Sequence, residues 1–80
     1  MDRDDELRIN AAWSLVHSLP DNKGICLHKD VLLSDGTNGS RVCVWNNVRT
    51  KNNPDLIGKL EGVDDTSLLN RAFTLAMEAE

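Results

Sequence analysis

The chain has 80 residues, of which 40% are hydrophobic and 28% are charged, and its formal net charge is −4. A chain of this length can build only one hydrophobic core, so residues 1–80 are predicted to form a single small domain. The composition is that of an ordinary globular protein, which argues against a disordered tail, and the acidic excess works against non-specific binding to nucleic-acid phosphates.

Neither a membrane segment nor a secretory signal is predicted. The longest apolar runs, which include Ala11–Trp13, are three residues long, whereas crossing a bilayer takes roughly 20. The first six residues are mostly acidic, where a secretory signal would be basic and then apolar. We therefore expect a cytoplasmic protein without a membrane partner.

The first predicted element is an amphipathic helix over residues 4–19. Its apolar residues recur at three- and four-residue steps, which places them on one stripe of a helix. The stripe consists of Ile9, Ala12, Trp13, Val16 and Leu19. Asp4, Asp5 and Glu6 lie in the first turn, where they complement the positive end of the helix dipole. Pro20 then ends the helix.

A β-hairpin is predicted to follow. Residues 25–33 alternate between apolar and polar or small side chains, which is typical of a half-buried strand. Residues 34–40 contain two glycines and no large apolar side chain, which indicates the hairpin loop. The alternation resumes at Arg41 with β-branched and aromatic residues and continues to Val48, which predicts the second strand.

The last part of the chain is predicted to hold a short strand and a second helix. Residues 50–55 are polar and include a proline, which favours a surface connection. Residues 56–63 alternate in the manner of a third strand, although two glycines weaken that pattern. Asp64–Thr66 supply helix-capping oxygens directly before an apolar face at helical spacing, which predicts a helix over 66–79.

These elements define an α+β fold, with the order helix, β-hairpin, short strand, helix. We expect a small antiparallel sheet packed against the two terminal helices, because a sheet of this size cannot leave both faces in water. The sequence does not say whether the helices cover one face of the sheet or both. The predicted core consists of Ile9, Ala12, Trp13, Val16, Leu27, Val42, Val44, Leu69, Ala72, Phe73 and Ala76.

Several short motifs resemble one known family. They are the Ala11–Trp13 segment with Val16 and Leu19, the hairpin that carries Trp45, and Gly62–Thr66 leading into Leu69–Phe73. Together they resemble the phage ABA sandwich domain family, small phage and prophage proteins in which an Ala-Ala-Trp helix precedes the strands and a Thr-capped, Ala-rich helix closes the chain. The resemblance covers nearly the whole chain. It implies a fold and a viral or prophage setting, and it implies no activity and no functional residues.

Metal binding and catalysis are not favoured by the chain's reactive residues. The thiols and imidazoles are those of Cys26, His28, Cys43 and His17. A Cys-x-His spacing is not that of a zinc finger, so we expect no metal, but reduced, buried thiols with a surface histidine. A Cys26 nucleophile activated by His28 is the weakest interpretation, since two such neighbours on a strand are common by chance. No nucleophile elbow, phosphate-binding loop or dinucleotide motif occurs. We expect neither a cofactor nor an enzymatic activity.

Trp45 is the strongest candidate for a binding residue. It shares a strand face with Cys43, opposite Val42 and Val44, so a sheet covered on one side would expose it. The alternative is that Trp45 lies in the core beneath a helix. The predicted binding residues are Trp45, Arg41, Arg49 and Lys51, because Trp and Arg are favoured at the centres of interfaces.

These residues predict a non-enzymatic interaction protein that binds another protein, or itself as a homodimer, through the hairpin. The alternative is a single-stranded nucleic-acid-binding protein that uses the same surface. In that case bases would stack on Trp45 while Arg41, Arg49, Lys51 and Lys59 hold the backbone. The acidic remainder of the chain ranks nucleic acid below protein.

Overall fold

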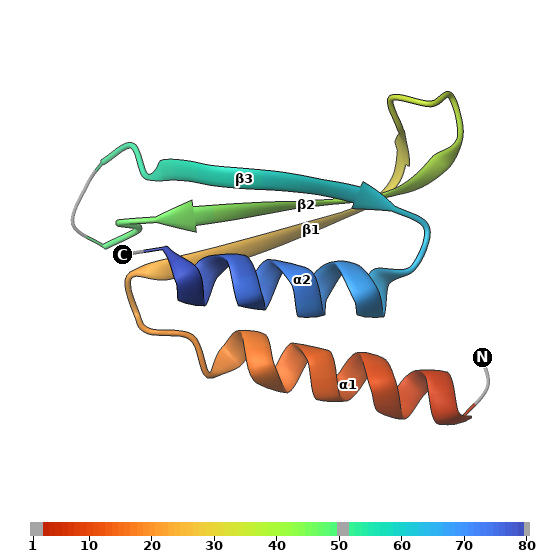
Figure 1. Cartoon of the computed structure of the whole chain (residues 1–80), viewed down its shortest axis with the longest axis horizontal. Coiled ribbons are helices and arrows are strands. Elements are labelled where there is room, and N and C mark those ends of the chain that lie inside the picture. Colours follow the sequence, from red (N-terminus) through yellow and green to blue (C-terminus); the bar gives the residue numbers. More distant parts are fainter. Residues whose placement is uncertain (1–2, 50–51, 80) are drawn as a thin grey trace.

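The structure, a computed structural model, describes residues 3–49 and 52–79. The elements in chain order are α1 (Arg3–His17), β1 (Lys23–Leu32), β2 (Asn38–Asn46), β3 (Asp55–Gly62) and α2 (Asp65–Glu78) (Figure 1). The α+β prediction is confirmed, with element ends that differ from the predicted ones by a few residues. Neither of the described helices is long and apolar enough to cross a membrane.

The β1–β2 loop is shorter than the predicted loop over 34–40. The Leu33 amide donates to the Thr37 carbonyl at 2.8 Å, and the Gly36 amide donates to the Leu33 carbonyl at 3.0 Å. Gly36 has a φ of 90°, which glycine adopts without the strain that a Cβ would bring. This tight turn lets β2 begin at Asn38, three residues before the position that side-chain alternation indicated.

The three strands form an antiparallel sheet in the order β1-β2-β3. In register, Ile25 pairs with Val44, and Val42 pairs with Leu60. The β2–β3 register shifts between Val44 and Trp45, where Gly58 and Leu56 are the respective partners. The shift leaves Ile57 as an extra residue on β3, as in a β-bulge.

The bulge changes the faces that Ile57 and Leu56 occupy. Regular alternation would put Leu56 on the same face as Leu60 and Ile57 on the other. In the structure Ile57 and Leu60 both pack against the core, whereas Leu56 pairs with Trp45 and is 43% exposed. An extra residue in a strand reverses the facing of everything beyond it.

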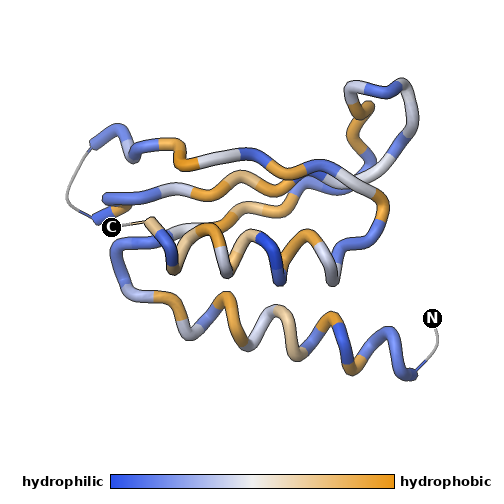
Figure 2. The backbone as a smooth tube through the Cα atoms, viewed as in Figure 1, coloured by the Kyte–Doolittle hydropathy of each residue, from blue (hydrophilic) through white to orange (hydrophobic). Residues whose placement is uncertain are grey.

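Both helices lie on the same side of the sheet (Figure 1). α2 lies directly against the strands, and α1 lies beside α2, so no described element covers the opposite face. We call the side that carries Val42, Val44, Ile57 and Leu60 the closed face, and the other side the open face. Figure 2 shows hydrophobic stretches in the middle of the strands and an alternation of hydrophobic and hydrophilic residues along both helices, as expected for helices that bury one side.

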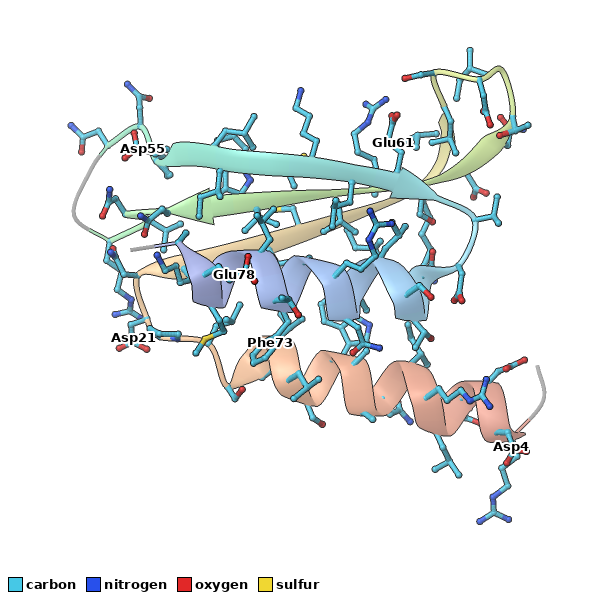
Figure 3. All side chains as sticks on the ribbon, viewed as in Figure 1. Asp4, Asp21, Asp55, Glu61, Phe73 and Glu78 are labelled. Carbon is cyan, nitrogen blue, oxygen red and sulfur yellow. The ribbon has the colours of Figure 1, made fainter. Side chains whose placement is uncertain are left out.

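The core lies between the closed face and the helices. Its buried hydrophobic residues are Ala12, Val16, Val42, Val44, Leu68, Leu69, Ala72 and Ala76. Seven of these were in the predicted core, and Ile9, Trp13 and Leu27 pack against it while remaining partly exposed. Phe73 is half-buried, on the side of α2 that faces α1 (Figure 3). Leu69 joins the two helices, because it clusters with Ala12 and Val16 of α1.

The predicted cap of α2 is confirmed. Asp64 is the N-cap, and its carboxylate accepts hydrogen bonds from the Thr66 amide at 3.1 Å and from the Ser67 hydroxyl at 3.0 Å. The next residue, Asp65, ties the helix to the sheet, because the buried Ser40 hydroxyl of β2 donates to its carboxylate. Lys29 also lies 3.5 Å from that carboxylate. The start of α2 is therefore fixed both along the chain and across to the strands.

Candidate functional site: the open face of the sheet

The open face consists of three rows of side chains that run across the strands. Each row takes one residue from β1, one from β2 and one from β3, since residues directly opposite one another share a face. The rows are His28–Arg41–Glu61, Cys26–Cys43–Lys59 and Gly24–Trp45–Leu56. The first row carries Arg41 and Glu61, and we call it the charged row; the second carries two thiols and an amine, and the third is apolar.

Trp45 alternates with the core residue Val44 and so lies on the open face, as predicted for a sheet covered on one side, and neither described helix lies on that face (Figure 1). Its partner on β1 is Gly24, which adds no side chain, and its partner on β3 is the partly exposed Leu56. A shallow hollow adjoins the tryptophan, and it is lined almost wholly by apolar atoms of Gly24, Ile25, Cys26, Trp45, Val48 and Pro54. We call Trp45, Val48, Pro54 and Leu56 the apolar end of the open face.

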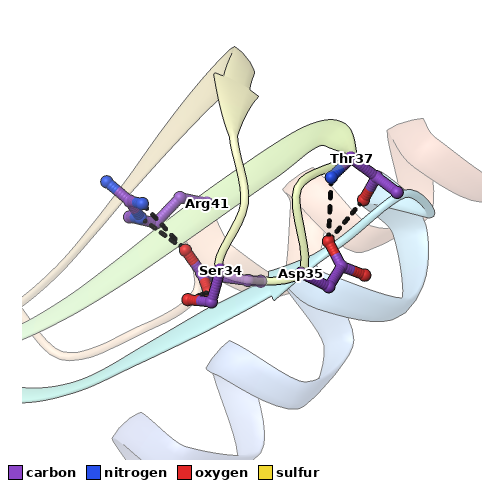
Figure 4. A network of polar contacts seen from close by, with 5 residues as sticks. Ser34, Asp35, Thr37 and Arg41 are labelled. Carbon is purple, nitrogen blue, oxygen red and sulfur yellow. Dashed lines mark hydrogen bonds and ion pairs between the residues drawn. The ribbon is translucent and has the colours of Figure 1, made fainter.

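Arg41 is held by an ion pair within the open face. Its Nε and Nη2 atoms both donate to Oε2 of Glu61, at 3.0 and 2.8 Å, and the Ser34 hydroxyl donates to Oε1 of Glu61 at 3.0 Å (Figure 4). The hydrogen bond from Arg41, and then that from Ser34, holds the pKa of the Glu61 carboxyl below its ordinary value. The positive charge predicted to meet a partner is thus largely compensated by a carboxylate on the same face.

The loop beside this ion pair is braced by its own carboxylate. Asp35 accepts hydrogen bonds from the Thr37 hydroxyl at 2.6 Å and from the Thr37 amide at 3.0 Å (Figure 4). These bonds lower the pKa of the Asp35 carboxyl, the hydroxyl having the larger effect. The hydrogen bond from Ser34 joins this loop to Glu61, which lies on the helix-free side of β3 (Figure 3).

The structure brings together only part of the predicted basic cluster. Arg41 and Lys59 lie on the open face with Trp45, in adjacent rows. Arg49 is exposed and follows the end of β2, outside the three rows. Lys51 lies outside the described residues.

The prediction of buried thiols is wrong. Cys26 is exposed, and Cys43 is half-buried; both are free thiols on the open face. Apolar residues flank both cysteines in the sequence, but the alternation of the strands places the two thiols on the face opposite to that of Val42 and Val44. Cys26 and Cys43 are direct partners across the hairpin, a pairing that the sequence left open but did not specify. The length of the loop alone does not set this register, because an irregularity in β1 between His28 and Val31 shifts the pairing by one residue.

The four candidate metal ligands do not converge. His17 lies on α1, with its ring centroid 6.1 Å from that of Trp13, and His28 lies in the charged row of the open face. Within residues 3–49 and 52–79, no group of three or more His, Cys, Asp or Glu side chains is arranged to hold a metal ion.

Comparison with protein-family models, with curated proteins and with solved structures finds no match to this chain. The candidate site is therefore defined by the geometry of the chain itself. Its central feature is an uncovered sheet face that is charged at one end and apolar at the other.

Proposed function

We propose that this protein is a small, non-enzymatic accessory protein of a phage or prophage, and that it binds another protein, or a second copy of itself, through the open face. The phage setting is supported by the sequence motifs around Ala11–Trp13 and Gly62–Thr66. The binding role is supported by the one-sided packing of the helices, which leaves a three-stranded surface without a covering layer among the described residues.

The observation that carries the binding role is the apolar end around Trp45. Trp45 is half-buried, Leu56 is 43% exposed, and the hollow beside them is almost entirely apolar. Protein interfaces concentrate aromatic side chains at a centre from which water is expelled and surround them with polar groups. Here the Arg41–Glu61 pair and Lys59 supply the polar surroundings on the same face.

A protein partner fits these charges better than single-stranded nucleic acid does. Nucleic acid needs cations that can neutralise phosphates, and the Arg41 guanidinium already lies 2.8 Å from a carboxylate oxygen. A partner protein can pair with both members of an ion pair, because its own surface carries both signs of charge.

The test compares two leucines of almost equal exposure. Leu56 on the open face is 43% exposed and Leu15 on α1 is 41% exposed. The unaltered chain would be compared with Trp45→Ala, Leu56→Ala and Leu15→Ala. Sedimentation velocity over a concentration series would measure self-association. Pull-down from a host lysate, with mass spectrometry of the retained proteins, would measure binding to another protein. Circular dichroism would verify that each variant is folded.

We expect the first two substitutions to abolish self-association, or retention of one identified protein, and Leu15→Ala to leave it unchanged. If Trp45→Ala impairs folding, Leu56→Ala decides the question alone. Equal binding by Leu56→Ala and Leu15→Ala would contradict the proposal. Fluorescence anisotropy with a labelled oligonucleotide covers the alternative: binding that needs Trp45 and weakens with salt would favour nucleic acid instead.

A further inference from the structure

We propose that Cys26 and Cys43 form a reversible cross-strand disulfide in the middle row of the open face. The two residues are direct partners in the β1–β2 register. This inference is independent of the proposed binding function, because it requires only the register of the hairpin and access of a small oxidant to one thiol.

The strand geometry suits a disulfide. Opposite residues of an antiparallel pair have Cα atoms about 4.5 or 5.5 Å apart, depending on their hydrogen bonding. A disulfide needs a Cα separation of about 4.4–6.8 Å, so both types of pair meet this requirement without separating the strands. Both side chains project to the same side, because the neighbouring pairs Ile25–Val44 and Leu27–Val42 face the core.

The flanking pairs also keep the thiols in place. Val42 and Val44 are fully buried, and their β1 partners pack against the same core. A slip of the register by one residue would bring the core residues to the solvent side, so the pairing of the two cysteines is fixed by the packing of the opposite face.

Access to the two thiols is unequal. Cys26 on the edge strand is exposed, whereas Cys43 on the central strand is half-buried. A small disulfide in solution, such as oxidised glutathione, therefore reaches the Cys26 sulfur more readily. Cys43 is then placed to resolve the mixed disulfide from across the strand pair.

The exchange balances in two steps. The Cys26 thiolate attacks one sulfur of oxidised glutathione, and the sulfur–sulfur bond breaks to release one glutathione thiolate. The Cys43 thiolate then attacks the Cys26 sulfur of the mixed disulfide and displaces the second glutathione thiolate. The two cysteines lose two electrons, oxidised glutathione gains them, and the two thiol protons pass to the released glutathiones. Excess reduced glutathione reverses both steps.

The test equilibrates the reduced, folded chain with buffers of stepped ratios of reduced to oxidised glutathione. Samples are quenched with acid and alkylated, and the mass of the intact protein is measured by mass spectrometry. We expect one main product that has lost about 2 Da, carries no glutathione and resists alkylation at both cysteines. Its fraction should not depend on protein concentration, because the bond is intramolecular.

Two single variants serve as controls. Cys43→Ser should stop at the mixed disulfide on Cys26, because no resolving thiol remains. Cys26→Ser should react with oxidised glutathione several-fold more slowly, because its remaining thiol is the less exposed one. In concentrated urea the intramolecular product of the unaltered chain should fall at least about tenfold, since the register that pairs the thiols is lost.

Three results would overturn the proposal. They are accumulation of doubly glutathionylated chain under native conditions, a disulfide-linked dimer as the main product, and an intramolecular product that forms equally well in urea. Failure of the Trp45 and Leu56 binding tests would leave this outcome unaffected, since none of these measurements uses a partner.

Discussion

The two faces of the sheet are built from the same strands, yet their side chains differ in burial. On the closed face Val42 and Val44 are fully buried against α2. On the open face the alternate residues Arg41, Cys43 and Trp45 are only half-buried. The period of two in a strand gives each face its own set of side chains. One set can therefore be fixed by packing while the other is left to meet solvent, oxidants or a partner.

The largest difference between the two faces is expected when a leucine on each side is replaced by alanine. Leu69→Ala removes a fully buried side chain that clusters with Ala12 and Val16 of α1. We expect it to lower the free energy of unfolding by about 2–5 kcal/mol, measured by urea denaturation, because a cavity remains where both helices meet.

The matched substitution on the open face is Leu56→Ala. Leu56 is 43% exposed, so its removal should cost less than about 1 kcal/mol. Equal losses for the two leucines would mean that the open face is covered, contrary to the one-sided packing of the helices.

A smaller effect is expected where the hairpin meets the end of β3. A Cβ on Gly39 would lie 2.5 Å from the Gly62 carbonyl oxygen and 2.7 Å from Leu33 Cδ1. Gly39→Ala should therefore force the backbone apart and lower the free energy of unfolding by about 1–3 kcal/mol.

Gly62→Ala is the control for this clash. A Cβ there would come no nearer than 3.5 Å to Leu68, which is ordinary contact, so the change should stay within about 0.5 kcal/mol. Thermal melts of both variants would measure the difference, and a neutral Gly39→Ala would show that the strands are not this close.

The N-cap of α2 should contribute less again. Asp64→Ala removes the acceptor of the Thr66 amide and Ser67 hydroxyl, and we expect a loss of about 0.5–2 kcal/mol by urea denaturation. Asp64→Asn keeps an acceptor and should recover most of that stability. If the asparagine and alanine variants were equally destabilised, the cap would not be the source of the effect.

The smallest effect concerns the ion pair of the open face. Folding lowers the pKa of Glu61 from its ordinary value of 4.5. The ionised carboxylate therefore stabilises the fold fully at pH values above that ordinary pKa. That stability is lost as the pH falls through the lowered pKa of the folded state. Glu61→Gln should flatten this part of the profile of melting temperature against pH. An unchanged profile would show that the Arg41–Glu61 pair is too solvated to matter.

The sequence predicted the elements well because each depends on local signals. The Asp64 cap, the helical spacing around Leu69 and the alternation around Val42 are all readable within a few residues. The bulge at Ile57 was not predicted, since two strands must pair before an extra residue is defined. For the same reason the sequence left the pairing of Cys26 with Cys43 open and did not predict the ion pair between Arg41 and Glu61, whose members belong to different strands.

The placement of both helices on one side could not be read from the sequence either. An amphipathic stripe shows that a helix buries one face, but not which side of a sheet receives it. The side that the helices cover decides whether Trp45 lies in the core or at the surface, so the candidate site depends on the tertiary packing. The reactivity of the two native thiols measures whether the open face is covered, because both thiols lie on that face.

The most direct test is therefore thiol accessibility in the folded chain. Reduced protein, dilute enough to be monomeric, would be mixed with an aromatic disulfide reagent and the reaction followed by absorbance. We expect the rate at which Cys26 reacts in the folded chain to be within about tenfold of its rate in urea. A thiol introduced by Val44→Cys, in a chain that also carries Cys26→Ser and Cys43→Ser, should react only when the chain unfolds. If Cys26 were as protected as the cysteine at position 44, a covering layer would lie over the open face, and the one-sided packing of the two helices would be contradicted.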